Sequence, residues 1–330
     1  MARLVNISLW VYVGSLLIWF VVRVLTGNQT MLALCFNYVG VWLFFPLLIF
    51  GPWVFLNRHQ LGIVSLIIPV GLFLWFYGPT LIPRRTQTIV LVQPVTVLTF
   101  NVRHGNTAVD ALLAVVDSRK AEILALQEVN SSHEEHLSAA LAERYPYHWY
   151  YRPAGLVVYS AHPILAQEIY PSQHWPLQSI VINVRETPFH LINAHLAPPG
   201  IFPFFETLDL DQVRDLAAAR ASQIAQIKNA MRETGLPTIV ACDCNMTNLT
   251  SAYAQITTNL RDAYKERGWG LGHTLLLPRG LEIRSRLNLP VQRIDYLFHS
   301  SEIRVAQVRV ITGDSGSDHR PLWARFDLQP

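Results

Sequence analysis

The stretch "PTIVACDCN", residues 237–245, carries the pattern that decides the fold of this chain. It is a short, β-rich apolar run that ends in a carboxylate, Asp243, and an amide, Asn245. Runs of this kind, bounded by turn residues, predict β-strands. A carboxylate at the end of a buried strand is costly unless it finds a partner. The polar end of this run therefore predicts a site.

The same pattern recurs along the chain. Four further runs are strand-like and bounded by turn residues: "VTVLTFNV" (95–102), "EILALQEV" (122–129), "FHLINAHL" (189–196) and "RIDYLFHS" (293–300). Residues 107–120 and 208–234 lie between such runs and have apolar residues three or four apart, which predicts helices. The alternation indicates a mixed α/β domain.

Polar residues fall at or near the ends of these runs, or just before the last apolar run, "PLWARFDL". They comprise four carboxylates, two amides and two histidines: Asn101, Glu128, His195, Asp243, Asn245, Asp295, Asp318 and His319. Each has an ordinary interpretation when taken singly, as a turn residue, a solvated loop or a structural histidine. As a set they predict convergence on a cation and an anionic substrate.

The first part of the chain has a different composition. Three apolar stretches, about residues 5–25, 31–56 and 61–82, each reach the roughly 20 residues that a helix needs to cross a bilayer. The first stretch is too long for a signal peptide and lacks a small-residue cleavage site. A very apolar soluble core is the alternative, but uncharged runs this long are rare in soluble folds. We predict a transmembrane domain over 1–83, a linker over 84–93 and a catalytic domain over 94–330.

The charge of the chain is unevenly placed. Residues 1–83 hold Arg3, Arg23 and Arg58 and no acidic residue, so they account for the formal net charge of +3 and the remainder is neutral. Nucleic-acid binding usually needs a basic face, and this balance does not support one. Basic residues flank the predicted spans on both sides, so the positive-inside count does not decide the orientation.

Two cysteines flank Asp243 in "CDCN". Cys242 and Cys244 occupy alternate positions of a predicted strand, where neighbouring side chains are poorly placed for a bridge. We interpret them as small core residues and expect no structural disulfide.

Six motifs follow one another through the predicted catalytic domain: "FNV" (100–102), "LQEV" (126–129), "AHL" (194–196), "CDCN" (242–245), "RIDY" (293–296) and "GSDHRPL" (316–322). Together they resemble the endonuclease/exonuclease/phosphatase family, which includes the DNase I-like nucleases, inositol polyphosphate 5-phosphatases and neutral sphingomyelinases. The resemblance covers about residues 94–328. It implies a two-sheet α/β sandwich of the DNase I-like type flanked by helices, with metal-dependent cleavage of phosphate esters at one edge of the sheets. The chain departs from the family at "CDCN", where Gly-Asp-Phe-Asn is usual, but both polar residues remain.

The resemblance implies a Mg²⁺ site, in which Mn²⁺ is a possible substitute. Glu128 is implied as the main metal ligand, with Asn101 beside it and Asp318 assisting. The residue types agree with this, because hard carboxylate and amide oxygens suit Mg²⁺, which binds few protein ligands.

The resemblance also implies a catalytic group. Asp243 and Asn245 would orient the attacking water and the phosphoryl oxygens, and His195 would donate to the phosphate. His319 would be held and polarised by Asp295, since a carboxylate partner sets the tautomer of an imidazole. The sequence leaves open whether Asp243 or His319 takes the proton of the water.

A third group is expected to touch substrate. Phe202, Phe204 and Phe205 lie in "APPGIFPFFETLD" (197–209), where the prolines exclude a regular helix or central strand. They either pack under the helix that follows or form an exposed apolar lip beside the site, which guides a lipid into it.

The whole chain is similar to bacterial membrane proteins with three N-terminal spans before such a domain, which usually lies outside the cytoplasm. We therefore expect a multi-pass protein of the cell membrane whose extracytoplasmic domain hydrolyses a phosphodiester, most simply that of a lipid headgroup in the bilayer. A membrane-tethered nuclease and a catalytically silent sensor of a phosphorylated ligand are the alternatives. The complete ligand set argues against the sensor. The headgroup and the oligomeric state are not predicted.

Overall fold

The computed structural model describes residues 2–27, 30–57, 60–82, 90–172, 175–200, 209–276 and 289–328. The chain falls into two units. The helical unit comprises Met1–Pro83 and Thr247–Ala254, and the sheet unit comprises Arg84–Met246 and Gln255–Pro330. Each unit is considered by itself.

The helical unit is built from short and long apolar helices. Its elements are α1 (Ala2–Leu25), α2 (Met31–Val39), the 3-10 helix η1 (Gly40–Phe44), α3 (Leu47–Leu56), α4 (Gln60–Ser65) and α5 (Ile67–Leu81). The polar side chain of Asn37 is buried among them and accepts hydrogen bonds from Trp19 Nε1 at 3.2 Å and from Arg23 Nη1 at 2.9 Å. These bonds satisfy polar groups in an otherwise apolar surrounding.

Two stretches of this unit are long and apolar enough to cross a membrane. They are Arg3–Leu25 and Gln60–Leu81, each with a mean hydropathy of 2.0. The predicted span over 31–56 is instead a bent pair, Ala33–Phe44 and Leu47–Leu56, with an angle of 43° between its halves. Pro46 lies at the break, where its ring fixes φ and it offers no N–H to continue the helix. Two of the three predicted spans are thus helices of sufficient length and apolarity, and the bent pair adds a third candidate only if both halves count as one span.

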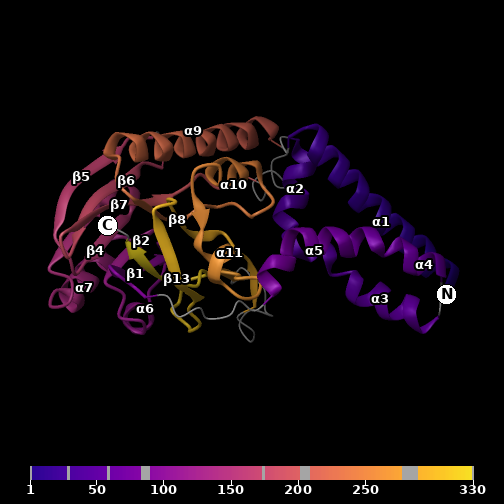
Figure 1. The fold of residues 1–330 in the computed structure, drawn as a ribbon, viewed down its shortest axis with the longest axis horizontal. Coiled ribbons are helices and arrows are strands. Elements are labelled where there is room, and N and C mark those ends of the chain that lie inside the picture. Colours follow the sequence, from indigo (N-terminus) through magenta and orange to yellow (C-terminus); the bar gives the residue numbers. More distant parts are fainter. Residues whose placement is uncertain are drawn as a thin grey trace. The chain divides into compact units, whose positions relative to one another are not determined.

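The sheet unit contains the predicted two-sheet α/β sandwich (Figure 1). One six-stranded sheet has the order β13-β14-β1-β2-β4-β3 and the other the order β5-β6-β7-β8-β12-β9. The strands of the first sheet are β1 (Pro94–Asn101), β2 (Ile123–Gln127), β3 (Tyr147–Tyr151), β4 (Leu156–Ser160), β13 (Ile303–Val310) and β14 (Leu322–Leu328). Those of the second are β5 (Ile164–Tyr170), β6 (Leu177–Val184), β7 (Thr187–His195), β8 (Thr238–Asp243), β9 (Arg261–Asp262) and β12 (Asp295–His299). A small separate pair is β10 (Leu275–Leu276) with β11 (Pro290–Gln292).

Alternation along the strands separates two cores. Residues such as Val97, Ala125, Leu191 and Ala241 belong to a cluster that joins strands of both sheets and fills the space between them. Their sequence neighbours, such as Leu98 on β1, point to the outer face of the first sheet and pack with residues of the helices there. This is the two-residue period of a pleated strand.

Helices cover the outer faces of the sandwich. In Figure 1, α9 (Leu210–Thr234) runs along one side of the strands, with α6 (Val109–Asp117) and α7 (Ser131–Leu141) on the other. The predicted helices over 208–234 and 107–120 correspond to α9 and α6. The remaining elements are α10 (Ser251–Ile256), α11 (Ala263–Arg267) and the 3-10 turn η2 (Arg152–Ala154).

A buried histidine on an inner strand of the second sheet gives a prediction on stability. His190 of β7 is fully buried, its ring hydrogen-bonds Ser179 Oγ at 2.8 Å, and burial lowers its pKa to about 4. As the pH is lowered, this histidine takes up a proton near pH 6.5 in the unfolded chain and only near pH 4 in the folded chain. The free energy of unfolding therefore decreases as the pH drops from 6.5 to about 4. We expect a loss of about 2 kcal/mol between pH 7 and pH 5, measured by urea unfolding of the detergent-solubilised chain. His190→Gln should reduce this loss, whereas replacement of the exposed His136 should leave it unchanged. An equal loss in the His190 variant would contradict the assignment.

Candidate active site

The inward-facing ends of the central strands meet at one edge of the sandwich. Asn101 ends β1, His195 ends β7 and Asp243 ends β8. β7 and β8 are parallel with His195 opposite Asp243, and β12 runs antiparallel to β8 with Asp295 opposite Asp243. The three residues at positions 101, 195 and 243 follow inward-facing positions by steps of two, so the pleat turns all of them into the space between the sheets.

Glu128 reaches the same place by a different route. It directly follows β2, and strict alternation would direct it to the face opposite that of its neighbour, Gln127. Its backbone instead adopts φ 58°, in the left-handed region. Such a conformation is uncommon for a residue with a side chain and is found preferentially at functional sites. The local turn brings the carboxylate to the edge where Asn101 and Asp243 end.

The carboxylates of Glu128 and Asp243 are held together by one amide. Asn101 Nδ2 donates to Glu128 Oε1 and to Asp243 Oδ2, both at 2.8 Å. The oxygen of the same amide accepts the backbone N–H of Arg103 at 2.9 Å, and the backbone N–H of His104 donates to Glu128 Oε2 at 3.0 Å. Because a backbone N–H can only donate, this network fixes which end of the Asn101 amide faces the carboxylates.

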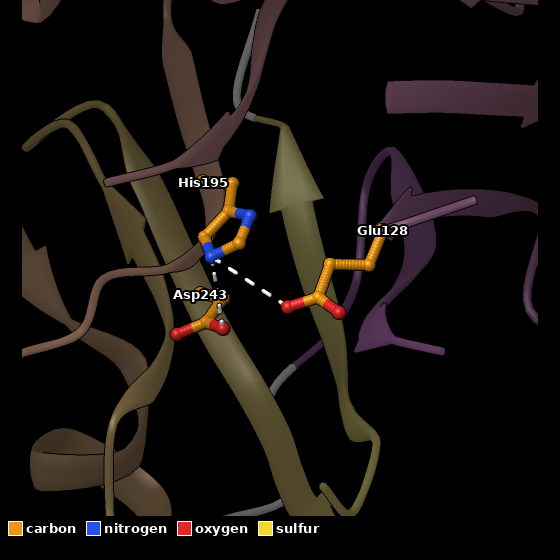
Figure 2. A group of neighbouring side chains, drawn as sticks. All are labelled: Glu128, His195 and Asp243. Carbon is orange, nitrogen blue, oxygen red and sulfur yellow. Dashed lines mark ion pairs between the residues drawn. The ribbon is translucent and has the colours of Figure 1, made fainter. Parts of the chain in front are cut away.

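His195 completes this first cluster. Its Nε2 lies 3.6 Å from Asp243 Oδ2 and 3.9 Å from Glu128 Oε1. Figure 2 shows the imidazole edge directed toward both carboxylates. Ligand atoms of Glu128, His195 and Asp243 lie within 4.8 Å of one another, close enough to hold one metal ion.

His319 forms a second cluster with Asp243 and Asp295. Its Nδ1 lies 2.9 Å from Asp295 Oδ2, and its Nε2 lies 3.8 Å from Asp243 Oδ2. Burial alone would lower the pKa of His319, but the charges of Asp295 and Asp243 outweigh it and raise this pKa to about 10. Burial raises the pKa of Asp295, against the pull of the imidazole. The two neighbouring acidic groups thus favour the protonated form of His319, and Asp295 holds its ring.

The loop that carries His319 is fastened to the first sheet. Ser317 Oγ donates to the carbonyl of Asn101 at 2.7 Å and accepts the backbone N–H of His319 at 3.0 Å. Asn106 Nδ2 donates to the carbonyl of Ser315 at 2.8 Å. The sequence pattern had not singled out Asn106 or Ser317 as separate contributors, because neither ends a strand.

Asn245 and Asp318 lie at the margin of the site. The side chain of Asn245 donates to the carbonyl of Leu196 at 3.0 Å, and its backbone N–H donates to Asp243 Oδ1 at 3.2 Å. Asp318 faces Arg103, with Oδ1 3.8 Å from Nε. Among the described residues, Asp318 belongs to neither group that could hold a metal. The implied roles of Asn245 at the water and of Asp318 at the metal stay predictions.

Two further expectations have different outcomes. Phe202, Phe204 and Phe205 lie outside the described residues, so their role as a lip stays a prediction. The expected absence of a disulfide finds no support, because the side chains of Cys242 and Cys244 lie side by side. Alternate residues of an extended strand lie about 6.6 Å apart, but the Cα atoms of the two cysteines are 5.1 Å apart, within the usual range for a bridge. β8 ends at Asp243, and the turn of the chain there closes the gap.

The residues present fit a hard divalent cation. Two carboxylates at hydrogen-bonding distance from one amide would repel each other without a positive charge between them. Carboxylate oxygens suit Mg²⁺ and Mn²⁺, and the imidazole of His195 is a nitrogen ligand that Mn²⁺ accepts more readily. Glu128 and Asp243 would hold the ion, with His195 in reach, and Asn101 holds both carboxylates in place.

Comparisons with known proteins agree with this geometry. The model of the "Endonuclease/Exonuclease/phosphatase family" matches residues 98–319. A search of curated proteins finds no match. The fold is similar to that of an endonuclease/exonuclease/phosphatase from Bacteroides vulgatus, with a TM-score of 0.57 and 20% identity over 72% of this chain and 100% of the other.

Two further structures share the fold at similar sequence identity and TM-score. Truncated TDP2 of Caenorhabditis elegans has a TM-score of 0.55 and 16% identity over 71% of this chain and 97% of the other. The mannosyl-6-phosphatase of Bacteroides thetaiotaomicron has a TM-score of 0.55 and 17% identity over 70% and 99%. The family match covers more than half of the chain and includes both clusters around Asp243. The chain belongs to the endonuclease/exonuclease/phosphatase family, whose members hydrolyse phosphate esters with the help of a divalent metal ion.

Proposed function

We propose that this enzyme is a membrane-anchored, Mg²⁺-dependent phosphodiesterase that hydrolyses the headgroup phosphodiester of a membrane lipid, with its active site outside the cytoplasm. The observation that carries the proposal is the presence of two helices able to span a membrane in the same chain as the site. An enzyme tethered in this way meets lipid at a high effective concentration. The neutral charge balance of residues 84–330 also favours a lipid over a polyanionic nucleic acid.

The side chains divide the chemistry among them. A divalent cation bound by Glu128 and Asp243 would neutralise charge on the phosphoryl oxygens. His195 lies beside both carboxylates and donates a hydrogen bond to the phosphate. The charges of Asp295 and Asp243 raise the pKa of His319, which favours its imidazole as a donor to the phosphoryl group. Asp243 lies 3.8 Å from this imidazole and is placed to accept the proton of the attacking water. Asp295 holds the imidazolium in place.

The experiment is a hydrolysis screen of the purified full chain in vesicles with Mg²⁺. Phospholipids and sphingomyelin in the bilayer are compared with a short-chain soluble phosphodiester, inositol phosphates and single- and double-stranded DNA. One bilayer lipid should be cleaved about 10²-fold faster than the soluble phosphodiester at equal concentration, because the anchor confines enzyme and lipid to one surface. Protease protection of a tag at residue 330 in spheroplasts tests the orientation.

The outcomes separate the alternatives. Faster cleavage of DNA than of any lipid would establish the tethered nuclease. Binding of a phosphorylated ligand without turnover of any substrate would establish the silent sensor. The Glu128→Gln chain in the same vesicles controls for contaminating hydrolases.

A further inference from the structure

Beneath the active site, buried amides connect the two sheets. Gln127 of β2 donates from Nε2 to Asn193 Oδ1 of β7 at 2.8 Å. Asn193 in turn donates from Nδ2 to Gln178 Oε1 of β6 at 3.0 Å, and Thr99 Oγ1 of β1 accepts from Gln127 Nε2 at 3.0 Å. All four side chains are fully buried. They form a polar layer beside a core cluster made of apolar residues.

The orientation of this amide pair is fixed by the backbone. Asn193 Nδ2 also lies 3.1 Å from the carbonyl of Leu126 and 3.2 Å from that of Val157, which can only accept. The nitrogen of Asn193 must therefore face the first sheet's carbonyls, and its oxygen must accept. Only the nitrogen of Gln127 can then face Asn193. The bond between the sheets has one possible polarity.

This layer lies next to the cation site, one or two residues earlier along the same strands. Thr99 is two residues before Asn101, Asn193 is two residues before His195, and Gln127 directly precedes Glu128. Side chains two apart on a strand share a face. Three of the four residues of the layer are thus the nearest inward-facing or immediate neighbours of residues that line the site.

The cation site itself is divided between the sheets. Asn101 and Glu128 come from the first sheet, and His195 and Asp243 come from the second. A shift of the sheets would change the separation of the two carboxylates directly. Apolar packing favours contact without specifying a direction, whereas a hydrogen bond sets both a distance and an angle between two named atoms.

The layer carries a cost that packing alone does not explain. Gln127 Oε1 is buried and has no hydrogen-bond partner among the described residues. A buried polar atom left unpaired costs free energy that an apolar side chain of the same shape avoids. Apolar side chains of the same shape would therefore stabilise the fold better than this network does.

We infer that the Gln127–Asn193 pair is a positioning pair, which holds the two halves of the cation site at ligand distance. The inference rests on the metal dependence of the proposed function and is independent of the substrate. Removing partners that orient metal ligands typically weakens metal binding or activity 10- to 100-fold.

The test uses the full chain in detergent and Mn²⁺ alone as the probe, with binding followed by electron paramagnetic resonance. Gln127→Met keeps the length of the side chain and removes both donors and the orphan oxygen. It should weaken Mn²⁺ binding about 10- to 100-fold and raise the Mg²⁺ concentration for half-maximal hydrolysis by a similar factor. Asn193→Leu should do the same, and the double variant should add little, because the two residues act as a pair.

Thr238→Val is the matched control. Thr238 is fully buried at the start of β8, the strand that ends in Asp243, and its hydroxyl lies 3.3 Å from His190 Nδ1. This variant should lower the melting temperature and leave the Mn²⁺ affinity unchanged. If Gln127→Met does not fold, Thr99→Val removes one acceptor of Gln127 with almost no change of shape, and a weaker Mn²⁺ affinity is still expected.

Variants of Gln127 or Thr99 that melt earlier but bind Mn²⁺ as the wild type does would overturn the inference and leave the layer a structural one. A wild-type chain that binds Mn²⁺ but cleaves no lipid would contradict the proposed substrate and leave the positioning pair intact. A wild-type chain that binds no Mn²⁺ would contradict the cation site, and the positioning pair with it.

Discussion

Replacing Glu128 by Gln is expected to reduce Mg²⁺-dependent hydrolysis by about three orders of magnitude, while the chain still folds. Both oxygens of Glu128 accept hydrogen bonds, one from the Asn101 amide and one from the backbone of His104. A Gln side chain has the same size, but its NH₂ group would face one of these donors and it brings no charge to a cation. The variant thus loses a charged metal ligand and one of the two hydrogen bonds that position the side chain.

The measurement combines hydrolysis over a Mg²⁺ titration with thermal unfolding. Activity should not recover at high Mg²⁺, and the melting temperature should stay close to that of the wild type, because one of two mutually repelling carboxylates is removed. Glu135→Gln, an exposed carboxylate on α7, controls for general effects of charge and should retain full activity. Hydrolysis that persists in Glu128→Gln, or in the wild type with excess chelator, would contradict the metal-dependent mechanism.

Replacing His319 by Ala is expected to lower kcat by about 10²- to 10⁴-fold. The imidazole is buried and lies 2.9 Å from Asp295 and 3.8 Å from Asp243, whose charges raise its pKa. Its loss removes a fixed donor and leaves Asp295 buried without its partner. Asp295→Asn should lower kcat less than His319→Ala, because the imidazole remains in place. It loses only the negative charge that holds it.

The double variant tests whether the two residues act as a unit. If Asp295 works only through His319, the double variant should be no slower than His319→Ala alone. The rates are compared at saturating Mg²⁺ on variants shown to be folded by circular dichroism. Single effects that multiply in the double variant would show that the residues act independently.

Much of the site could be predicted from the sequence because strands impose a simple geometry. Apolar runs that end in Asn101, His195 and Asp243 point their last side chains to one face by a two-residue period. Parallel pairing of β7 with β8 then places two such ends together. The run "PTIVACDCN" therefore predicted that Asp243 ends a buried strand. The helices over 107–120 and 208–234 were predicted from apolar residues three or four positions apart.

The helical unit shows where a local pattern stops being sufficient. Hydropathy predicts three apolar stretches, but the middle one bends by 43° at its break. The sequence contains Pro46, yet prolines are tolerated in membrane helices when neighbours satisfy the freed backbone groups. Whether such a helix continues or breaks depends on its packing partners, which hydropathy does not record.

The sequence by itself determined the α/β class, the strand ends that carry the site and the residue types that favour a cation, because these depend on composition and period alone. Only the tertiary structure decided the rest. The left-handed backbone of Glu128 overrides strand alternation. The bond between His319 and Asp295 joins residues that are 24 positions apart in the sequence. The proximity of Cys242 to Cys244 arises from the turn that ends β8. Distances between segments far apart in the chain are set by packing, and no local pattern encodes them.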